Sequence, residues 1–197
     1  MSIQLPLGDD TNSMTTLVIT KIGHFFKNEE EIITGTDGNL LFFVTKSKSN
    51  RRILRDPNGY PLLTIYEHQK WFSMDEYKIF KGDSIDQSNL LWTANASSMF
   101  EFSSIMDVFA VTNMARKPCD FKIKKKSFSE SYYFHSGYSD VVVAKIKTIN
   151  KLENFLKGKQ TRRLEIFQKV DLSFIVSLYV VLDMFEETKG QSSAGGD

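Results

Sequence analysis

Short apolar runs separated by glycine-containing turns recur along most of this 197-residue chain. Residues 36–39 read Thr-Asp-Gly-Asn and residues 56–59 read Asp-Pro-Asn-Gly, and each tetrapeptide lies between two apolar runs. Asp-Gly and Asn-Gly in this setting indicate hairpins, because glycine tolerates the positive φ that a tight turn requires. Strands that recur roughly every 8–12 residues predict an all-β sandwich or barrel.

The remaining strands are predicted from the same pattern. They cover residues 17–26, 32–33, 40–44, 52–55, 60–66, 76–80, 90–94, 120–126, 132–135 and 140–149, with two short strands within 99–113. Gly82 and Gly137 mark two further turns. The four prolines fall in turns or near strand ends, as an all-β fold requires.

Residues 171–187 break this pattern and predict a helix. Asp171 is well placed to cap its first turn, and the apolar residues that follow occupy nearly every face. The stretch is shorter than the roughly 20 apolar residues of a membrane span, so we expect a helix threaded through the barrel core. A long buried strand is the alternative, because its valines and isoleucines favour β geometry. Glu186 and Glu187 are expected to fray into solvent, since the helix dipole disfavours acids there.

The length of the chain fits one domain, or two small ones at most. We expect a flexible N-terminus at 1–14, one domain at 15–187 and a disordered tail at 188–197. The 16 phenylalanines and 7 tyrosines are core material rather than the composition of a disordered chain. A lone cysteine excludes a disulfide framework. With no visible signal peptide or membrane span, the expected location is intracellular and cytoplasmic.

A formal net charge of +1 conceals three blocks of opposite sign. Residues 1–113 carry 10 basic and 14 acidic side chains, residues 114–170 carry 14 and 5, and residues 171–197 carry 1 and 5. A central basic block of this kind is a candidate footprint for phosphate groups. The alternative is that these side chains pair with acids elsewhere or are simply solvated.

Lysines alternate with apolar residues in the predicted strand at 120–126. Because successive side chains point to opposite faces, Phe121 and Ile123 are expected in the core and Lys122, Lys124 and Lys126 outside. Like charges in one row raise each other's energy, and a polyanion would relieve this repulsion. Lysines on an outer or edge strand that merely prevent aggregation are the competing interpretation.

Lys145 and Lys147 repeat the arrangement, with Ile146 expected to face inward. If the two strands are neighbours, five ammonium groups line one surface. Four basic side chains are expected to join it from loops: Arg116, Lys117, Arg162 and Arg163. Such a surface suits an inositol phosphate head group or an anionic lipid.

No catalytic or metal site assembles from the sequence. His24, His68 and His135 are scattered and lack metal-ligand spacing. Cys119 has basic neighbours that would favour a thiolate, but a packing role is the ordinary one. Neither a phosphate-binding glycine loop nor a Gly-x-Ser-x-Gly motif is present. We therefore expect a protein that is not an enzyme and that uses no cofactor or metal.

The order of these segments resembles the LURP-one-related family of plant proteins, which is similar in fold to Tubby C-terminal domains and phospholipid scramblases. The resemblance spans about residues 17–185. It is carried by segments 36–42, 55–65, 77–83, 141–147 and 170–174. It implies a mainly β, closed antiparallel barrel of about twelve strands around a central hydrophobic C-terminal α-helix.

The resemblance implies no particular biochemical activity, because none is established for the family, and it supplies no catalytic residues. Plant members are associated with basal defence, and Tubby relatives bind phosphoinositide head groups and move between plasma membrane and nucleus. The first hypothesis is therefore a module of plant defence signalling that docks on acidic phospholipid, as a cytoplasmic, peripheral plasma-membrane or nuclear protein. The second is a nucleic-acid or transcription-associated protein, in which Tyr132, Tyr133 and Phe134 would stack on bases.

Overall fold

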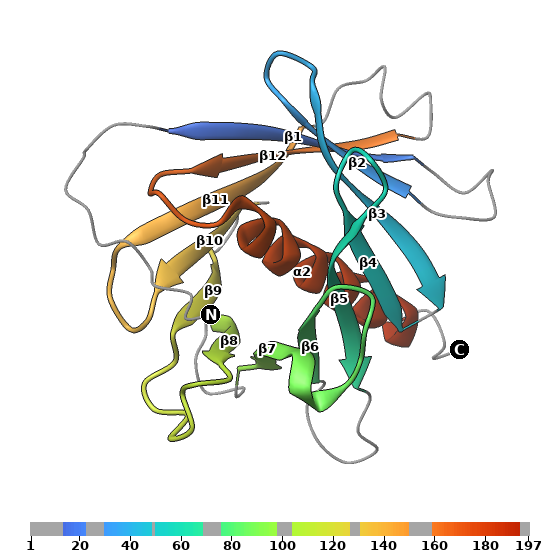
Figure 1. The fold of residues 1–197 in the computed structure, drawn as a ribbon. Helices are drawn as coiled ribbons and strands as arrows, with labels where there is room; N and C mark the ends of the chain where they lie inside the picture. Colours follow the sequence, from blue (N-terminus) through green and yellow to red (C-terminus); the bar gives the residue numbers. More distant parts are fainter. Residues whose placement is uncertain are drawn as a thin grey trace.

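The computed structural model describes residues 14–22, 30–48, 50–68, 76–97, 104–126, 131–149 and 159–193. Within these ranges, twelve strands form one closed barrel and the helix α2 lies inside it (Figure 1). The elements are β1 (Thr15–Ile22), β2 (Glu30–Gly35), β3 (Leu40–Lys48), β4 (Arg51–Arg55), β5 (Pro61–His68), β6 (Glu76–Lys81), the short 3-10 helix η1 (Gln87–Asn89), β7 (Leu90–Ala96), β8 (Ser104–Ala110), β9 (Phe121–Lys125), β10 (Ser131–Ser136), β11 (Val142–Ile149), β12 (Lys159–Ile166) and α2 (Leu172–Ser193).

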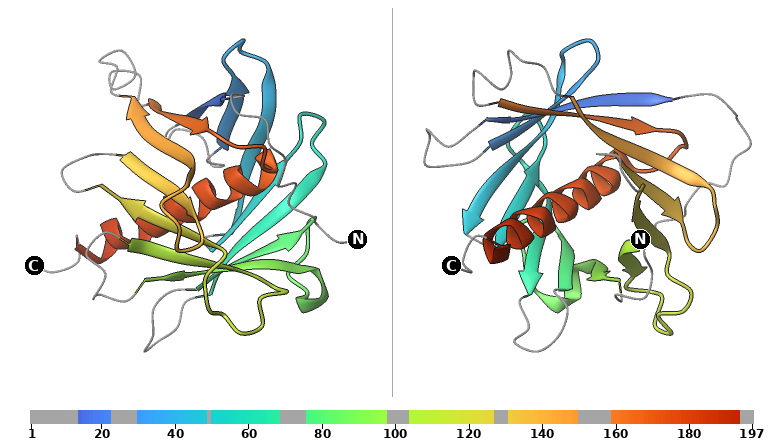
Figure 2. Two further views of the ribbon diagram at one scale, coloured as in Figure 1. Left: turned by 90° about the vertical axis from the view of Figure 1, so that its left-hand side faces the viewer. Right: turned by 180° about the vertical axis from the view of Figure 1, so that it is seen from behind.

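Neighbouring strands in the barrel are neighbours in sequence. Each pairs antiparallel with the next, and β1 pairs with both β2 and β12, which closes the barrel without an exposed edge. Figure 2 shows α2 crossing the interior from one end of the barrel to the other. The predicted fold class, a closed antiparallel barrel of about twelve strands around one C-terminal helix, is confirmed.

The two strongest turn signals form hairpins, as predicted. Gly38 joins β2 to β3 with φ 82° and Gly59 joins β4 to β5 with φ 89°, the backbone region that favours glycine. The Asp56 carboxylate accepts the backbone N–H groups of Asn58 at 3.0 Å and Tyr60 at 2.8 Å. A short polar side chain thus holds the backbone in its turn conformation.

Two segments differ from the prediction. Arg162 and Arg163, expected in a loop, lie in the strand β12, which runs between β1 and β11. Residues 99–113, expected to hold two strands, contain β8 in their described part, and 98–103 lie outside the described residues. The predicted flexible N-terminus also lies outside them, except for Met14.

Helix α2 fills the barrel because nearly all of its faces are apolar. Residues Leu172–Ser193 form an α-helix, so the alternative of a long buried strand is wrong. Ile175, Val176, Leu178 and Val180 have no exposed surface. The helix continues to Ser193, past the predicted end at 187. The expectation that its acidic residues fray into solvent is therefore also wrong.

The Asp171 carboxylate caps the first turn of α2. It accepts the backbone N–H groups of Ser173 at 2.8 Å and Phe174 at 3.2 Å. We expect Asp171→Ala to lower the free energy of unfolding by about 1 kcal/mol, because two helical N–H groups lose their acceptor. Urea denaturation measures this loss. The matched variant Gln168→Ala, at an exposed position just before the helix, should change stability by less than about 0.5 kcal/mol, and equal losses in both variants would contradict the capping role.

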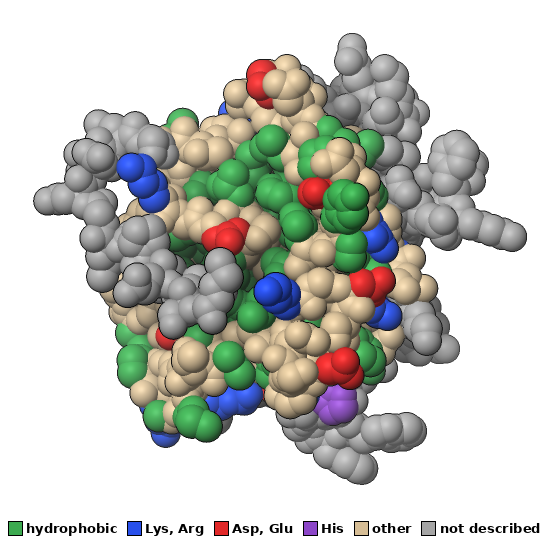
Figure 3. Space-filling model, in the orientation of Figure 1, with side chains coloured by type: hydrophobic (Ala, Val, Ile, Leu, Met, Phe, Trp, Pro, Cys, Tyr) green, Lys and Arg blue, Asp and Glu red, His purple; other side chains and the backbone are tan. Residues whose placement is uncertain are grey.

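The two ends of the barrel interior differ in chemistry. Near the start of α2, Phe174 packs against Trp92 and Phe121, with ring centroids 4.4 Å and 5.1 Å apart. Figure 3 views this end of the barrel, where hydrophobic side chains are visible at the centre and reach the rim. Near the other end of α2, charged side chains replace the apolar ones.

Candidate functional site

Three strands place a group of basic side chains on the outside of the barrel. We call Lys124 of β9, Lys145 and Lys147 of β11, and Arg163 of β12 the outer basic face. Their sequence neighbours Ile123, Ile146 and Leu164 are fully buried toward the core, at 1% exposure or less, so strand alternation turns the basic side chains outward. This placement agrees with the predicted orientation of Lys124, Lys145 and Lys147.

The strands β9 and β11 are not neighbours, because β10 lies between them. Tyr133 of β10 pairs with Lys124 on one side and Lys145 on the other, so the row reads lysine, tyrosine, lysine. Lys145 Nζ lies 5.2 Å from the centre of the Tyr133 ring. Two strand spacings put Lys124 and Lys145 about 10 Å apart, a span that suits a head group with several phosphates.

Like charges also meet across β11 and β12. Lys147 pairs directly with Arg163, whereas Lys145 pairs with Glu165. In the part of the chain that the structure describes, no ion pair joins the outer basic face to a carboxylate. Facing cations at one strand pair are unfavourable unless an anion lies between them.

Lys122 is on the outer side of β9 but is not available to a ligand. Its side chain is only 4% exposed, with Nζ 3.6 Å from an Asp107 oxygen and 4.6 Å from the centre of the Tyr138 ring. The expectation of an exposed row of three lysines is therefore wrong for its first member. Lys126 follows β9 and is exposed.

The two loop residues lie elsewhere on the barrel. Arg116 folds back over β6 to β8, where it approaches Glu76 at 3.6 Å and the Phe109 ring at 5.7 Å. Lys117 follows it in the same connection and is exposed. Arg116 thus forms contacts of its own outside the outer basic face.

Arg162 and Arg163 are strand residues with opposite orientations. Arg163 is exposed, whereas Arg162 is buried and points into the barrel toward α2. The same alternation applies to the aromatic run in β10, where Tyr132 and Phe134 face the core and Tyr133 faces outward. The predicted aromatic stacking surface is therefore reduced to one side chain.

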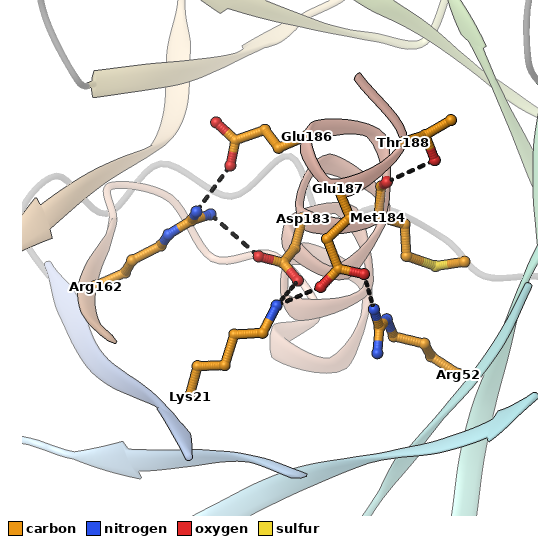
Figure 4. A network of polar contacts seen from close by, with 8 residues as sticks. All are labelled: Lys21, Arg52, Arg162, Asp183, Met184, Glu186, Glu187 and Thr188. Carbon is orange, nitrogen blue, oxygen red and sulfur yellow. Dashed lines mark hydrogen bonds and ion pairs between the residues drawn. The ribbon is translucent and has the colours of Figure 1, made fainter. Parts of the chain in front are cut away.

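A network of charges inside the barrel holds the C-terminal half of α2. We call it the inner polar network, and it consists of Lys21, Arg52, Arg162, Asp183, Glu186 and Glu187 (Figure 4). Lys21 donates to Asp183 at 2.9 Å and also pairs with Glu187. Arg162 donates to Glu186 at 2.7 Å and lies 3.6 Å from Asp183. Three basic side chains from the strands thus pair with three acidic side chains of the helix and replace the solvent contact expected there.

Burial and charge shift several pKa values in this region. Burial alone would raise the pKa of Asp183, but Lys21 and Arg162 hold it below its ordinary value. Burial would likewise lower the pKa of Lys21, yet Asp183 and Glu187 raise it. Both groups are therefore charged at neutral pH, as an ion pair requires.

Glu31 is the exception in this region. It is 2% exposed, and neither carboxylate oxygen has a hydrogen bond of good geometry, although the Tyr179 side chain lies close by. Burial, followed by the charge of Asp183, raises the pKa of Glu31 to about 7. This carboxyl group therefore titrates in the physiological range.

The inner polar network was missed in the sequence, although it leaves a signal there. Lys21 continues the core-facing alternation of Leu17 and Ile19, and Asp183 interrupts an otherwise apolar helix. A charge at a core position needs partners, because an isolated buried charge is very costly. Charged residues at inward positions of several strands were therefore candidates to meet Asp183.

The remaining candidates have no catalytic geometry among the described residues. Cys119 is buried, and burial followed by the charge of Asp107 raises its pKa to about 11, so the thiol is a poor nucleophile. His68 is exposed, burial lowers the pKa of His135, and His24 lies outside the described ranges. Within those ranges, no three His, Cys, Asp or Glu side chains are grouped to hold a metal ion.

Comparisons with known proteins agree with the fold. A family model described as LURP-one-related matches residues 15–183. Protein LURP-one-related 15 of Arabidopsis thaliana is 36% identical, over 77% of this chain and 71% of that protein. Protein LURP-one-related 10 of the same plant is 37% identical, over 77% of this chain and 79% of that protein. A crystal structure of a protein from Arabidopsis thaliana superposes with a TM-score of 0.64 at 29% identity, covering 87% of this chain and 91% of that one.

Proposed function

The chain belongs to the LURP-one-related family, and we propose that it is a non-enzymatic binding module that docks on acidic phospholipid through the outer basic face. The observation that carries the proposal is the outward row Lys124, Tyr133 and Lys145, together with the facing pair Lys147 and Arg163. Among the residues that the structure describes, these four cations have one acid paired with them across the strands, Glu165, so the face attracts anions. Phosphorylated inositol head groups match their spacing and charge.

The alternative of nucleic-acid binding has less support. Proteins that bind single-stranded DNA or RNA without sequence preference combine basic side chains with several aromatic rings that stack on the bases. Of the three aromatic residues expected to stack on bases, only Tyr133 lies on the outer face of β10, because Tyr132 and Phe134 face the core. Binding to lipid head groups requires no stacking, so the outer basic face suits a membrane surface better than a nucleic acid.

The proposal extends to a setting in the cell. We propose a cytoplasmic protein bound peripherally at the plasma membrane, with a role in plant defence signalling, on the family resemblance. In the described part of the chain, no helix is both long and apolar enough to span a membrane. Attachment through the outer basic face needs no such helix.

Vesicle co-sedimentation tests the docking. The protein should sediment with phosphatidylcholine vesicles containing phosphatidylserine or phosphatidylinositol bisphosphate, and less so at higher salt, because salt screens exposed charges. Lys145→Gln with Lys147→Gln should weaken this binding roughly 30-fold, since each lysine near an anionic membrane contributes about 1 kcal/mol. The measured quantity is the apparent Kd at two salt concentrations.

A matched control removes two charges from another side of the barrel. Arg51→Gln with Lys78→Gln alters cations that pair across β5 with the same residue, Tyr66, and binding should change by less than about threefold. Equal losses in both double variants would show an unspecific charge effect and contradict the proposal. Binding to a single-stranded oligonucleotide at low salt, with no binding to either anionic vesicle, would support the alternative instead.

A further inference from the structure

Exposed apolar side chains gather at the end of the barrel where α2 begins. Among the described residues, the large apolar side chains that are most exposed all lie in, or next to, the connections at this end. They are Met14, Leu40, Tyr60, Ile85, Val111, Met114, Tyr138, Val141 and Phe167. Figure 3 shows apolar side chains on this end, at its centre and along its rim. Exposed apolar groups that cluster in this way mark an interaction surface.

Four of these side chains form a continuous segment of the rim, which we call the apolar arc: Met14, Tyr138, Val141 and Phe167. Thr15, which follows Met14, pairs with Ile166, which precedes Phe167. The Phe167 N–H donates to the Val143 carbonyl at 2.9 Å. The β10–β11 turn then brings Tyr138 next to Val141, since Ser136 N–H donates to the Val141 carbonyl at 3.0 Å.

The apolar arc and the outer basic face belong to the same part of the barrel. The arc caps the ends of β10, β11, β12 and β1, and the basic residues project from β9, β11 and β12. Lys145 is four residues from Val141 along the chain, a separation of about 13 Å. A long lysine side chain can lean along the strand toward a surface that the arc touches.

The opposite part of the rim has similar apolar tips but a different charge. Tyr60 and Ile85 are as exposed as the residues of the arc, at 67% and 51%. Their loops and the neighbouring β2–β3 turn carry the acids Asp37, Asp56, Asp83 and Asp86, of which Asp83 pairs with Arg51. An anionic surface is therefore attracted more strongly to the side of the outer basic face than to this side of the rim.

Two acids also lie close to the apolar arc. Asp171 caps α2, so its charge is offset by the N–H groups of the first helical turn. Asp140 is exposed in the β10–β11 turn, and Lys169 is exposed just before the helix. The net charge next to the apolar arc is thus close to zero. The wider surface is positive because of the outer basic face.

We propose that the apolar arc inserts into the interface of the anionic membrane that the outer basic face attracts, so that the start of α2 faces the bilayer. This inference rests on the proposed function and adds the orientation of the barrel and a second source of affinity. Tyrosine and phenylalanine suit this position, because aromatic side chains are favoured at the boundary between head groups and acyl chains. Binding of this kind combines buried apolar area with attraction to anionic lipid.

Tryptophan fluorescence tests the orientation directly. Tyr138→Trp places a reporter in the arc, and Tyr60→Trp places an equally exposed reporter on the acidic part of the rim. With vesicles of phosphatidylserine and brominated phosphatidylcholine, the emission of Tyr138→Trp should shift to shorter wavelength and be quenched beyond the wild-type signal. Tyr60→Trp should behave as wild type. Equal quenching of both reporters, or of neither, overturns the inference.

Affinity gives a second, independent readout. Tyr138→Ser with Phe167→Ser should weaken vesicle binding about tenfold, and Tyr60→Ser with Ile85→Ser should leave it unchanged. Loss of binding in Lys145→Gln/Lys147→Gln, with no effect of the arc variant and no quenching, would retain the proposed docking and overturn the insertion. Absence of binding to every vesicle would overturn both.

Discussion

Replacing Asp183 by asparagine should lower the free energy of unfolding by about 3 kcal/mol, because the half-buried Lys21 and the buried Arg162 lose their shared partner. Asp183 is 2% exposed. Its carboxylate accepts a hydrogen bond from Lys21 Nζ at 2.9 Å and lies 3.6 Å from Arg162 Nη1. Glu186 and Glu187 remain as partners for these cations, so we expect the lower end of the range for a broken buried pair. Urea denaturation at neutral pH measures the loss.

A control and a double-mutant cycle make this prediction specific. Asp140→Asn removes an exposed carboxylate and should change stability by less than about 0.5 kcal/mol. Lys21→Met added to Asp183→Asn should cost less than the sum of the two single changes, because the pair is then removed together. A loss below about 1 kcal/mol for Asp183→Asn would mean that the inner polar network does not hold the helix.

Replacing Glu31 by glutamine should stabilise the protein, and more so at pH 8 than at pH 5. The pKa of Glu31 is about 7 in the folded barrel against an ordinary 4.5, so the folded state binds the proton more strongly. Between pH 4.5 and pH 7, Glu31 is deprotonated in the unfolded chain but still protonated in the folded barrel, so the stability of the wild type falls as the pH rises. The difference between the two pKa values corresponds to a loss of about 3 kcal/mol of stability. Glutamine carries no titrating group and removes this loss.

The measurement is the difference in free energy of unfolding between variant and wild type at pH 5, 6, 7 and 8. This difference should grow in favour of Glu31→Gln as the pH rises and level off above pH 7. Any constant effect of the amide on packing cancels in the comparison across pH. A difference that stays constant from pH 5 to pH 8 would show that Glu31 has the same pKa in the folded and unfolded states, and would contradict the prediction.

The hairpins were predictable because their determinants are local. Gly38 and Gly59 each adopt a positive φ that few other residues tolerate, and Asp56 binds backbone groups within four residues of itself. The cap at Asp171 is equally local. Such contacts depend on neighbouring positions in the chain, so a sequence pattern indicates them directly.

The strand β12 was not predictable in the same way. Its residues Arg162 and Arg163 were expected in a loop, because they lie in a charged stretch without apolar alternation. The segment is extended because β1 and β11 supply hydrogen-bonding partners on both sides. Position between two strands thus overrides a weak local preference.

The candidate binding surface was predictable in part for a related reason. Alternation correctly turned Lys124, Lys145 and Lys147 outward, but it could not show that β10 separates their strands. Nor could it show that Asp107 and Tyr138 cover Lys122. Which side chains of a strand point outward follows from the alternation within that strand, whereas the burial of an outward side chain depends on its neighbours.

By itself, the sequence determined the hairpins, the helix cap and the apolar character of α2, since each of these follows from neighbouring residues and their backbone preferences. Only the tertiary structure decided which charges meet. Lys21, Arg162 and Asp183 are far apart in the chain and come together because antiparallel register and the position of α2 bring them to one end of the barrel. Long-range electrostatic contacts depend on distance in space, and the closure of the barrel sets that distance.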